Sequence, residues 1–207
     1  YGEGVFVVGY SVVAMATFAA LTHYVALHRF DQPQASLLVS IPPVRGGLLA
    51  LSVFGFTSFV TAVLVYPRFP MATFRHRVTE ARGVQQVTRH PFFSGIALWA
   101  AAHALLAPSQ VTFIYFVGIV VLSIVGGMHQ DRRLIDELGE GYRAYVAATS
   151  FWPFVAVLTK RQKIRWREQP WFAFGVGIGA SVALYDIHAH IFDHGGAYVT
   201  LWLGREP

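Results

Sequence analysis

The chain contains no cysteine, and it is poor in charge. None of its 207 residues is Cys, and only 13% are Asp, Glu, Lys or Arg. The missing thiols exclude disulfide frameworks, thiolate metal sites, iron–sulfur clusters and cysteine nucleophiles. Soluble domains carry about 25% charged residues, so a chain with about half that share lacks the surface that water requires. With 55% hydrophobic residues and a mean hydropathy of +0.48, the composition indicates a membrane protein.

Long apolar runs predict an all-α fold, a polytopic bundle of transmembrane helices that forms one domain over residues 1–207. A helix needs about 20 apolar residues to cross a bilayer. Five segments approach that length: 4–27, 46–66, 90–107, 111–128 and 171–192. The third begins at His90 and Pro91, and Pro91 suits the first turn of a helix because no backbone N–H is needed there. The fifth is interrupted late by Asp186, His188 and His190.

Lys and Arg are concentrated in two of the segments between these helices. Residues 67–89 hold five of the 16 and residues 130–169 hold eight, which leaves Arg29, Arg45 and Arg205. With five spans both basic segments lie on one side, and the positive-inside rule makes that side cytoplasmic. We therefore expect a protein of the bacterial inner membrane, with its N-terminus inside and its C-terminus outside. The basic residues form no continuous face, so nucleic acid is not an expected partner.

Residues 131–148 predict an amphipathic helix that lies on the membrane surface. Its apolar positions are three or four residues apart: Leu134, Ile135, Leu138, Tyr142, Tyr145 and Val146. This period is typical of a helix with one apolar face. We expect the charges on the other face to meet solvent and lipid headgroups. The basic run KRQKIRWR at 160–167 is expected to bind headgroups as well.

Histidine is the residue type that remains for metal chemistry, and the chain has nine. Ionisable groups inside a bilayer are costly and usually have a function or a partner. At a rise of about 1.5 Å per residue, His23 and His103 each lie about four residues inside the outer end of their spans. The two imidazoles are therefore expected at one depth. His90 and His129 form the corresponding pair at the inner face.

Two membrane histidines at one level on different helices are what a haem b requires. It needs axial imidazoles from two sides and apolar walls around the macrocycle. Small and aromatic residues suited to packing around a planar ring occur near His103: Gly95, Trp99, Ala100, Ala101 and Ala102. One alternative is a histidine that only hydrogen-bonds a neighbouring helix. Another is a metal site near the C-terminal membrane exit, formed by Asp186, His188, His190, Asp193 and His194.

Three segments resemble the NnrU family, which includes the 15-cis-ζ-carotene isomerases of plants and cyanobacteria. Residues 83–103, GVQQVTRHPFFSGIALWAAAH, are similar to the signature (I/V)-T-R-H-P-x3-G-x2-L-W-x3-H. Residues 127–164 resemble the family's G-x-x-x-D-R-R, G-E-x-[FWY], T-S-x-x-P-F and G-R-Q segments. THYVALHR at 22–29 resembles H-S-G-x-x-x-x-R, with Tyr24 and Val25 in place of the small Ser and Gly beside His23.

This resemblance implies an integral membrane haem b protein in which His23, His90 and His103 carry the function. Isomerase members shift the 15-cis double bond of tricis-ζ-carotene by a redox-dependent change at ferrous haem. Together with the depth argument, the resemblance favours His23 and His103 as axial, metal-binding and catalytic ligands. His90 then caps the inner end of the third helix or replaces one ligand in another redox state. NnrU-type proteins of bacteria are associated with denitrification.

Two other functions fit part of the sequence. Residues 134–145 also resemble a looser pattern of membrane methyltransferases that use S-adenosylmethionine, although residues 130–133 replace the paired glutamates of those enzymes. The non-enzymatic alternative is a haem-bearing or haem-free subunit of a larger membrane complex for electron transfer or pigment organisation. The expected partners are a hydrophobic polyene or lipid substrate, membrane lipids and, for the last alternative, other membrane subunits.

Overall fold

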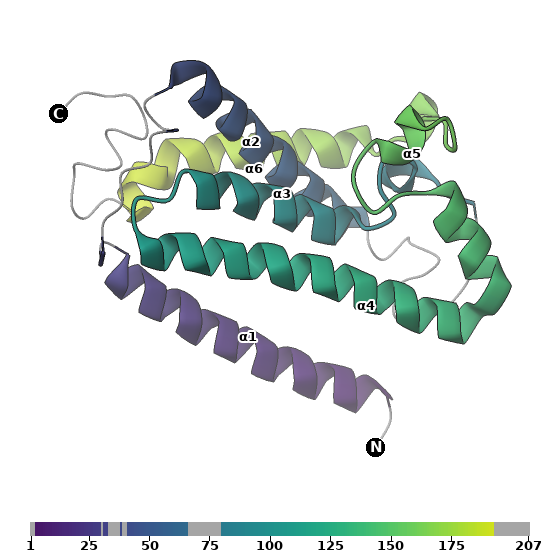
Figure 1. The fold of residues 1–207 in the computed structure, drawn as a ribbon, viewed down its shortest axis with the longest axis horizontal. Helices are drawn as coiled ribbons and strands as arrows, with labels where there is room; N and C mark the ends of the chain where they lie inside the picture. The colour runs from purple at the N-terminus through teal and green to yellow at the C-terminus, as the bar shows by residue number, and fades with distance from the viewer. Residues whose placement is uncertain (1–2, 30, 33–37, 39–40, 66–79, 193–207) are drawn as a thin grey trace.

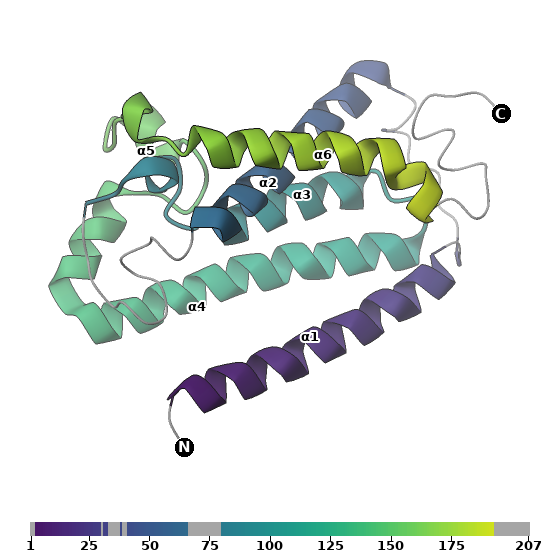
Figure 2. The ribbon, with the colours of Figure 1, turned by 180° about the vertical axis from the view of Figure 1, so that it is seen from behind.

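The fold is all-α in the computed structural model, which describes residues 3–29, 31–32, 38, 41–65 and 80–192. Five longer helices run along the long axis of the molecule (Figures 1 and 2): α1 (Glu3–His28), α2 (Pro42–Val65), α3 (Pro91–Leu105), α4 (Gln110–Ala148) and α6 (Trp171–Phe192). Short elements connect them: the 3-10 turns η2 (Gly83–Gln86) and η3 (Trp166–Glu168), and α5 (Val155–Leu158). The described residues contain no strand, which confirms the predicted fold class.

The helix starts follow local sequence signals. Pro91 occupies the first turn of α3, where the missing N–H of proline costs no hydrogen bond within the helix. Ser109 precedes α4 in an extended conformation, and its side-chain oxygen accepts a hydrogen bond from the Thr112 backbone N–H at 3.2 Å. That bond satisfies one of the N–H groups that the first turn of a helix leaves unpaired.

Three helices are long and apolar enough to cross a membrane: α1 over Val8–His28, α2, and α4. The chain is therefore a membrane protein. α3 and the Trp171–Ile187 part of α6 are apolar but shorter. All five segments expected to span the bilayer are helical, and the number of crossings stays a prediction.

α4 combines two elements that the sequence analysis kept apart. The apolar segment 111–128 continues directly into the amphipathic segment 131–148, and the helix bends at Gly139, where φ is 59° and ψ is −138° (Figure 1). The apolar face of residues 131–148 packs against other residues of the protein. Leu134, Tyr142 and Tyr145 form a buried cluster with Ala81, and further apolar residues pack around it: Ile135, Leu138 and Val146.

Replacing Gly139 by alanine should destabilise the fold, because a side chain at this backbone conformation is strained. Such conformations cost about 1–3 kcal/mol for residues other than glycine. Nothing lies within 4 Å of the added Cβ, so the strain is the whole effect. The matched control is Gly118→Ala in the same helix, which also has open space and no positive φ. Thermal unfolding in detergent should show a lower midpoint for Gly139→Ala alone, and equal midpoints would contradict the assignment.

α2, α3, α4 and α6 pack as one group, and α1 stands at its edge. α3 packs against both α2 and α4, and α6 packs against α2. In both views α1 lies beyond α4 (Figures 1 and 2). No residue of the most apolar window of α1 is buried within the protein, so lipid is the expected neighbour of most of its surface.

Candidate functional site

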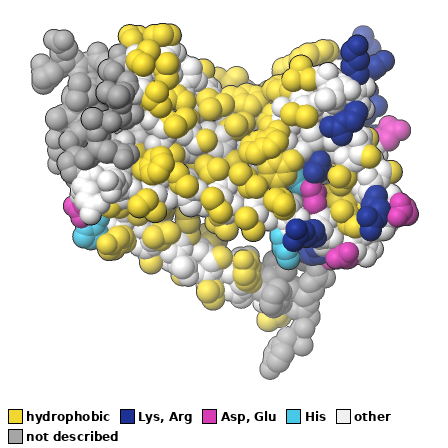
Figure 3. All heavy atoms as spheres, viewed as in Figure 1, with side chains coloured by type: hydrophobic (Ala, Val, Ile, Leu, Met, Phe, Trp, Pro, Cys, Tyr) yellow, Lys and Arg dark blue, Asp and Glu magenta, His cyan; other side chains and the backbone are white. Residues whose placement is uncertain are grey.

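Charged and histidine side chains divide between the two ends of the bundle. Lys and Arg gather at the end where α3 begins and α4 bends, and hydrophobic side chains cover the middle of the visible face (Figure 3). His90 lies at this basic end, directly before α3. His103 lies near the opposite end of α3. The rise of an α-helix places these two histidines roughly 20 Å apart along α3, so they cannot be the two axial ligands of one iron.

His103 is held in one orientation by its own helix. Its Nδ1 lies 2.8 Å from the Trp99 carbonyl oxygen. A carbonyl can only accept, so Nδ1 carries a proton and donates. The ring also packs against two aromatic rings, with centroids 4.5 Å from Trp99 and 4.9 Å from Phe116. An N–H bound to a carbonyl is the usual support of a metal-ligating imidazole.

His23 reaches the level of His103 through two adjacent residues of α4. Thr22, directly before His23, hydrogen-bonds through Oγ1 to the Tyr115 hydroxyl at 2.8 Å. The next residue, Phe116, is the ring that contacts His103. His23 itself is exposed, and no described residue forms a hydrogen bond with it. The structure thus brings both histidines to the same end of the bundle, on different helices, and their roles as ligands stay a prediction.

His90 belongs to a buried polar cluster at the basic end. It is the residue before α3, but its side chain does not cap that helix. Instead its Nε2 lies 2.7 Å from Asp131 Oδ1. The same carboxylate accepts hydrogen bonds from Arg89 through Nε and Nη2 at 3.0 and 2.8 Å, and from the Tyr142 hydroxyl at 2.7 Å. Asp131 therefore joins the start of α3 to both parts of α4.

The hydrogen bonds of the cluster set the protonation of Asp131 and Tyr142, which lie beyond the apolar segment 111–128. Burial alone would raise the pKa of the Asp131 carboxyl, but hydrogen bonds from His90 and Arg89 outweigh it and hold the pKa well below its usual range. Burial, then the hydrogen bond to Asp131, raises the pKa of Tyr142. Asp131 is thus a carboxylate and Tyr142 a neutral donor. One negative charge is matched by Arg89.

This cluster was not predicted from the sequence. His90 was expected to pair with His129, which is exposed, whereas the partner of His90 is Asp131. The signal lies in two separate motifs, T-R-H-P at 88–91 and D-R-R at 131–133. The opposite charges of Arg89 and Asp131 make an ion pair between the two motifs possible. The motifs are about 40 residues apart in the chain, however, and no spacing rule predicts a contact over that separation.

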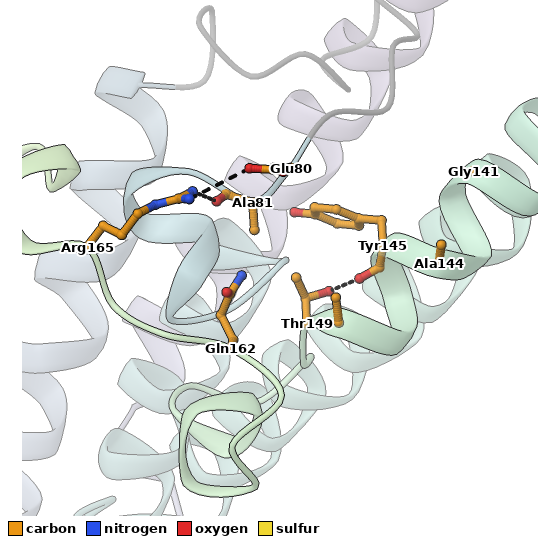
Figure 4. A pocket seen from close by; sticks show the side chains of 9 residues that line it. Glu80, Ala81, Gly141, Ala144, Tyr145, Thr149, Gln162 and Arg165 are labelled. Atoms are coloured by element: carbon orange, nitrogen blue, oxygen red, sulfur yellow. Dashed lines mark hydrogen bonds and ion pairs between the residues drawn. The ribbon is translucent and has the colours of Figure 1, made fainter.

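A pocket of about 450 Å³ opens beside the cluster at the basic end (Figure 4). The end of α4, residues 80–81 and the segment after α5 form its walls, with Glu80, Tyr145, Thr149, Gln162 and Arg165 as the polar lining residues. The Arg165 guanidinium is occupied: it bonds the Ala81 carbonyl oxygen and pairs with the Glu168 and Glu80 carboxylates at 2.8 and 3.7 Å. The described residues of these walls therefore offer no free positive charge to an anionic ligand.

Other candidate metal ligands do not gather within the described part of the chain. No three residues of the types His, Cys, Asp and Glu come together there in a way that could hold a metal ion. His28 pairs with Asp31 at 2.7 Å on the exposed end of α1. The suggested C-terminal metal site lies outside what the structure describes, because the side chains at 188 and 190 and residues 193–194 are not described.

Comparison with known proteins gives the class and then the family. A helical bundle with three helices long and apolar enough to cross a membrane defines the class, an integral membrane protein. The model of the NnrU protein family matches residues 1–194, and the chain belongs to this family. No solved structure matches it.

Two curated relatives are 15-cis-ζ-carotene isomerases of chloroplasts. The protein from Zea mays is 27% identical over 173 residues, and the match covers 79% of this chain and 44% of the relative. The protein from Arabidopsis thaliana is 28% identical over 171 residues, covering 78% and 44%. The chain thus spans less than half the length of the curated relatives it matches.

Proposed function

We propose that this protein is a haem b-dependent membrane isomerase that acts on a cis polyene of the ζ-carotene type. Three observations support the proposal. The chain belongs to the NnrU family, and two relatives are 15-cis-ζ-carotene isomerases. His23 and His103 lie on different helices at one end of an apolar bundle. Thr22, Tyr115 and Phe116 connect the neighbourhoods of these two histidines, and this arrangement carries the assignment of the site.

The residues present fit a haem b. The Nδ1–H of His103 is fixed by the Trp99 carbonyl, so a metal would bind this imidazole through Nε2. His23 offers a second imidazole without a partner among the described residues. Trp99, Phe116 and Tyr115 provide aromatic surfaces of the kind that line a porphyrin. When bound there, haem b supplies a redox-active iron beside the polyene.

A hydrocarbon substrate requires an apolar approach, and α1 and α4 provide one. Both helices expose large hydrophobic side chains along the membrane part of the bundle, among them Met15, Phe18, Leu21, Phe113, Val117 and Val121. A polyene dissolved in the bilayer can reach the His23 level along this surface without crossing water. The basic end has no such role, because its pocket is lined by Glu80, Gln162 and Arg165.

The His90 cluster is assigned a structural role in this proposal. Its carboxylate is saturated by hydrogen bonds from Arg89, His90 and Tyr142, and it ties the start of α3 to α4. The methyltransferase alternative loses support at the same place. Three residues of its pattern, Leu134, Tyr142 and Tyr145, are buried in a core cluster. In the pocket beside them, the positive charge of Arg165 is already paired with the Glu168 and Glu80 carboxylates.

The orientation follows from the charge distribution. We place the basic end, where α4 bends, on the cytoplasmic side of a bacterial inner membrane. Most Lys and Arg residues of the described part gather at this end (Figure 3), with Arg29 and Arg45 as the exceptions. The His23 and His103 level then lies toward the outer face. A tag inserted at the described loop residue Lys163 should be accessible only from the cytoplasmic side. Labelling of this tag from outside the cell would reverse the assignment.

The function is tested by purification and by isomer analysis. We expect noncovalent haem b with a low-spin, bis-histidine spectrum, and conversion of 15-cis-ζ-carotene in cells that accumulate it. His23→Ala and His103→Ala should each remove or convert the spectrum and abolish conversion. His129→Ala is the matched control, because this histidine is exposed on α4, and it should change neither. A colourless protein from haem-replete cells contradicts the haem assignment.

The isomer analysis also separates the two haem-bearing alternatives. Full haem occupancy without conversion would assign the protein to electron transfer or to a larger membrane complex. Conversion that persists in both histidine variants would contradict the ligand pair and leave the activity intact. Chromatography of the extracted carotenoids distinguishes these outcomes directly.

A further inference from the structure

We propose that Tyr115 is a positioning residue, whose hydroxyl bonds Thr22 and so fixes the height and rotation at which α1 presents His23. The proposal rests on the proposed function, in which His23 is a ligand. The bond joins Tyr115 on α4 to the residue directly before His23 at 2.8 Å. Successive residues of a helix point about 100° apart, so holding Thr22 against α4 also fixes the direction in which His23 leaves α1.

The direction of this hydrogen bond follows from the second bond of Thr22. The Thr22 hydroxyl also lies 2.8 Å from the Phe18 carbonyl oxygen, which can only accept. A threonine hydroxyl has one hydrogen, so that hydrogen points to Phe18. The Tyr115 hydroxyl is therefore the donor to Thr22 Oγ1. Removing either hydroxyl removes the bond between the helices, whereas serine at position 22 retains the acceptor.

The bond is important because the rest of α1 is weakly anchored. Its most apolar window has no residue buried within the protein. Tyr115 also supplies a ring contact to Phe18, with centroids 6.2 Å apart. At the C-terminal end of the helix, Thr112 Oγ1 donates to the Arg29 carbonyl oxygen at 3.3 Å. In a bilayer, helices gain little from apolar contact with each other, so hydrogen bonds and close packing decide where α1 sits.

Two adjacent residues of α4 each support one of the two histidines. Tyr115 holds Thr22, next to His23, and Phe116 packs against His103 at 4.9 Å. The spacing between the two ligands is thus set by one short segment of α4. A loss of the Tyr115 bond frees α1 and His23 and leaves His103 and its Trp99 hydrogen bond in place.

The experiment compares Tyr115→Phe, which keeps both ring contacts, with Thr22→Val and Thr22→Ser. We expect Tyr115→Phe and Thr22→Val each to lose haem about threefold to tenfold more readily, as removal of one interhelical bond in a membrane implies. Both should show a larger high-spin fraction by electron paramagnetic resonance. Thr22→Ser should behave like the unchanged protein. Thr17→Val is the matched control, because the Thr17 hydroxyl bonds only the Val13 carbonyl of its own helix.

A double variant tests whether the two hydroxyls act through one bond. Tyr115→Phe combined with Thr22→Val should be no worse than Thr22→Val alone, since both changes remove the same interaction. Additive effects would overturn the proposal. It would also be overturned if Thr17→Val matched Thr22→Val, or if Tyr115→Phe left haem retention and spin state unchanged.

A haem-independent measurement separates this proposal from the proposed function. The chain has no cysteine, so cysteines introduced at the exposed positions Val13 on α1 and Val121 on α4 accept two spin labels without background. We expect one narrow distance distribution in haem-free protein and a broader one in Tyr115→Phe. Equal widths overturn the positioning role. A protein that binds no haem, yet shows the broadening, retains the role of Tyr115 in placing α1 and loses only the haem assignment.

Discussion

Gly55→Ala should push α2 and α3 apart and leave much less folded protein. A Cβ at Gly55 would lie 2.5 Å from the Trp99 backbone nitrogen and 2.8 Å from the Gly95 carbonyl oxygen. Both atoms belong to the backbone of α3 and cannot move aside alone. A Cβ at Gly95 would meet the Phe59 backbone nitrogen at 2.6 Å, so the contact is close from both sides. Overpacking of this kind costs about 3 kcal/mol.

The measurement is thermal unfolding in detergent together with the monodisperse yield on size exclusion. Gly46→Ala and Gly47→Ala are matched controls in α2, because nothing lies within 4 Å of a Cβ at either position. They should unfold at the same temperature as the unchanged protein or slightly higher, since alanine favours a helix over glycine. A Gly55→Ala protein with unchanged unfolding temperature would show that α2 and α3 do not approach in this way.

Asp131→Ala should destabilise the protein about as strongly. The change leaves the Arg89 charge, whose side chain is 13% exposed, without its carboxylate, and it orphans the hydrogen bonds of His90 and Tyr142. Breaking a buried ion pair by removing one partner costs about 3–5 kcal/mol. Asp131→Asn keeps an acceptor and should lose less. The control is Glu140→Ala in the same helix, where the pair with Arg143 spans 3.2 Å at the exposed surface and contributes little.

The pH dependence of unfolding provides an independent check of the Asp131 cluster. The pKa of the folded Asp131 carboxyl lies below its unfolded value. Its contribution is therefore fully present above the ordinary aspartate pKa of about 3.9 and declines as the pH falls below that value. Asp131→Ala has no such contribution to lose. The stability difference between the two proteins should be smaller at pH 3 than at pH 5, and an equal difference at the two pH values would contradict the pairing.

The sequence predicts the helices well because lipid imposes a simple rule on them. Apolar runs of span length, with Pro91 at one start, locate every long helix of the described structure. The expectation that His23 and His103 lie at one level comes from counting residues along helices. The apolar side of residues 131–148 is a different case. A helix that packs against protein and a helix that lies on a membrane surface have the same spacing of apolar residues. The pattern of residues 131–148 therefore could not show that Leu134 and Tyr142 are packed inside the protein.

The polar contacts of the site depend on information that no local pattern contains. His90 meets Asp131 because α4 runs past the start of α3, and Tyr142 joins them because α4 bends at Gly139. The bond between Thr22 and Tyr115 depends on the docking of two helices whose surfaces are apolar almost everywhere else. A single hydroxyl on each helix does not predict such a pair.

The glycine contact between α2 and α3 also bears on the electronic properties of His103. The Trp99 backbone that Gly55 abuts is the same residue whose carbonyl oxygen receives the His103 Nδ1–H. A carbonyl that cannot shift holds this hydrogen bond at a fixed length, and the strength of such a bond tunes how readily an imidazole donates electrons to a metal. The packing of α2 against α3 would then influence the reduction potential of an iron bound at His103, although α2 itself contributes no ligand.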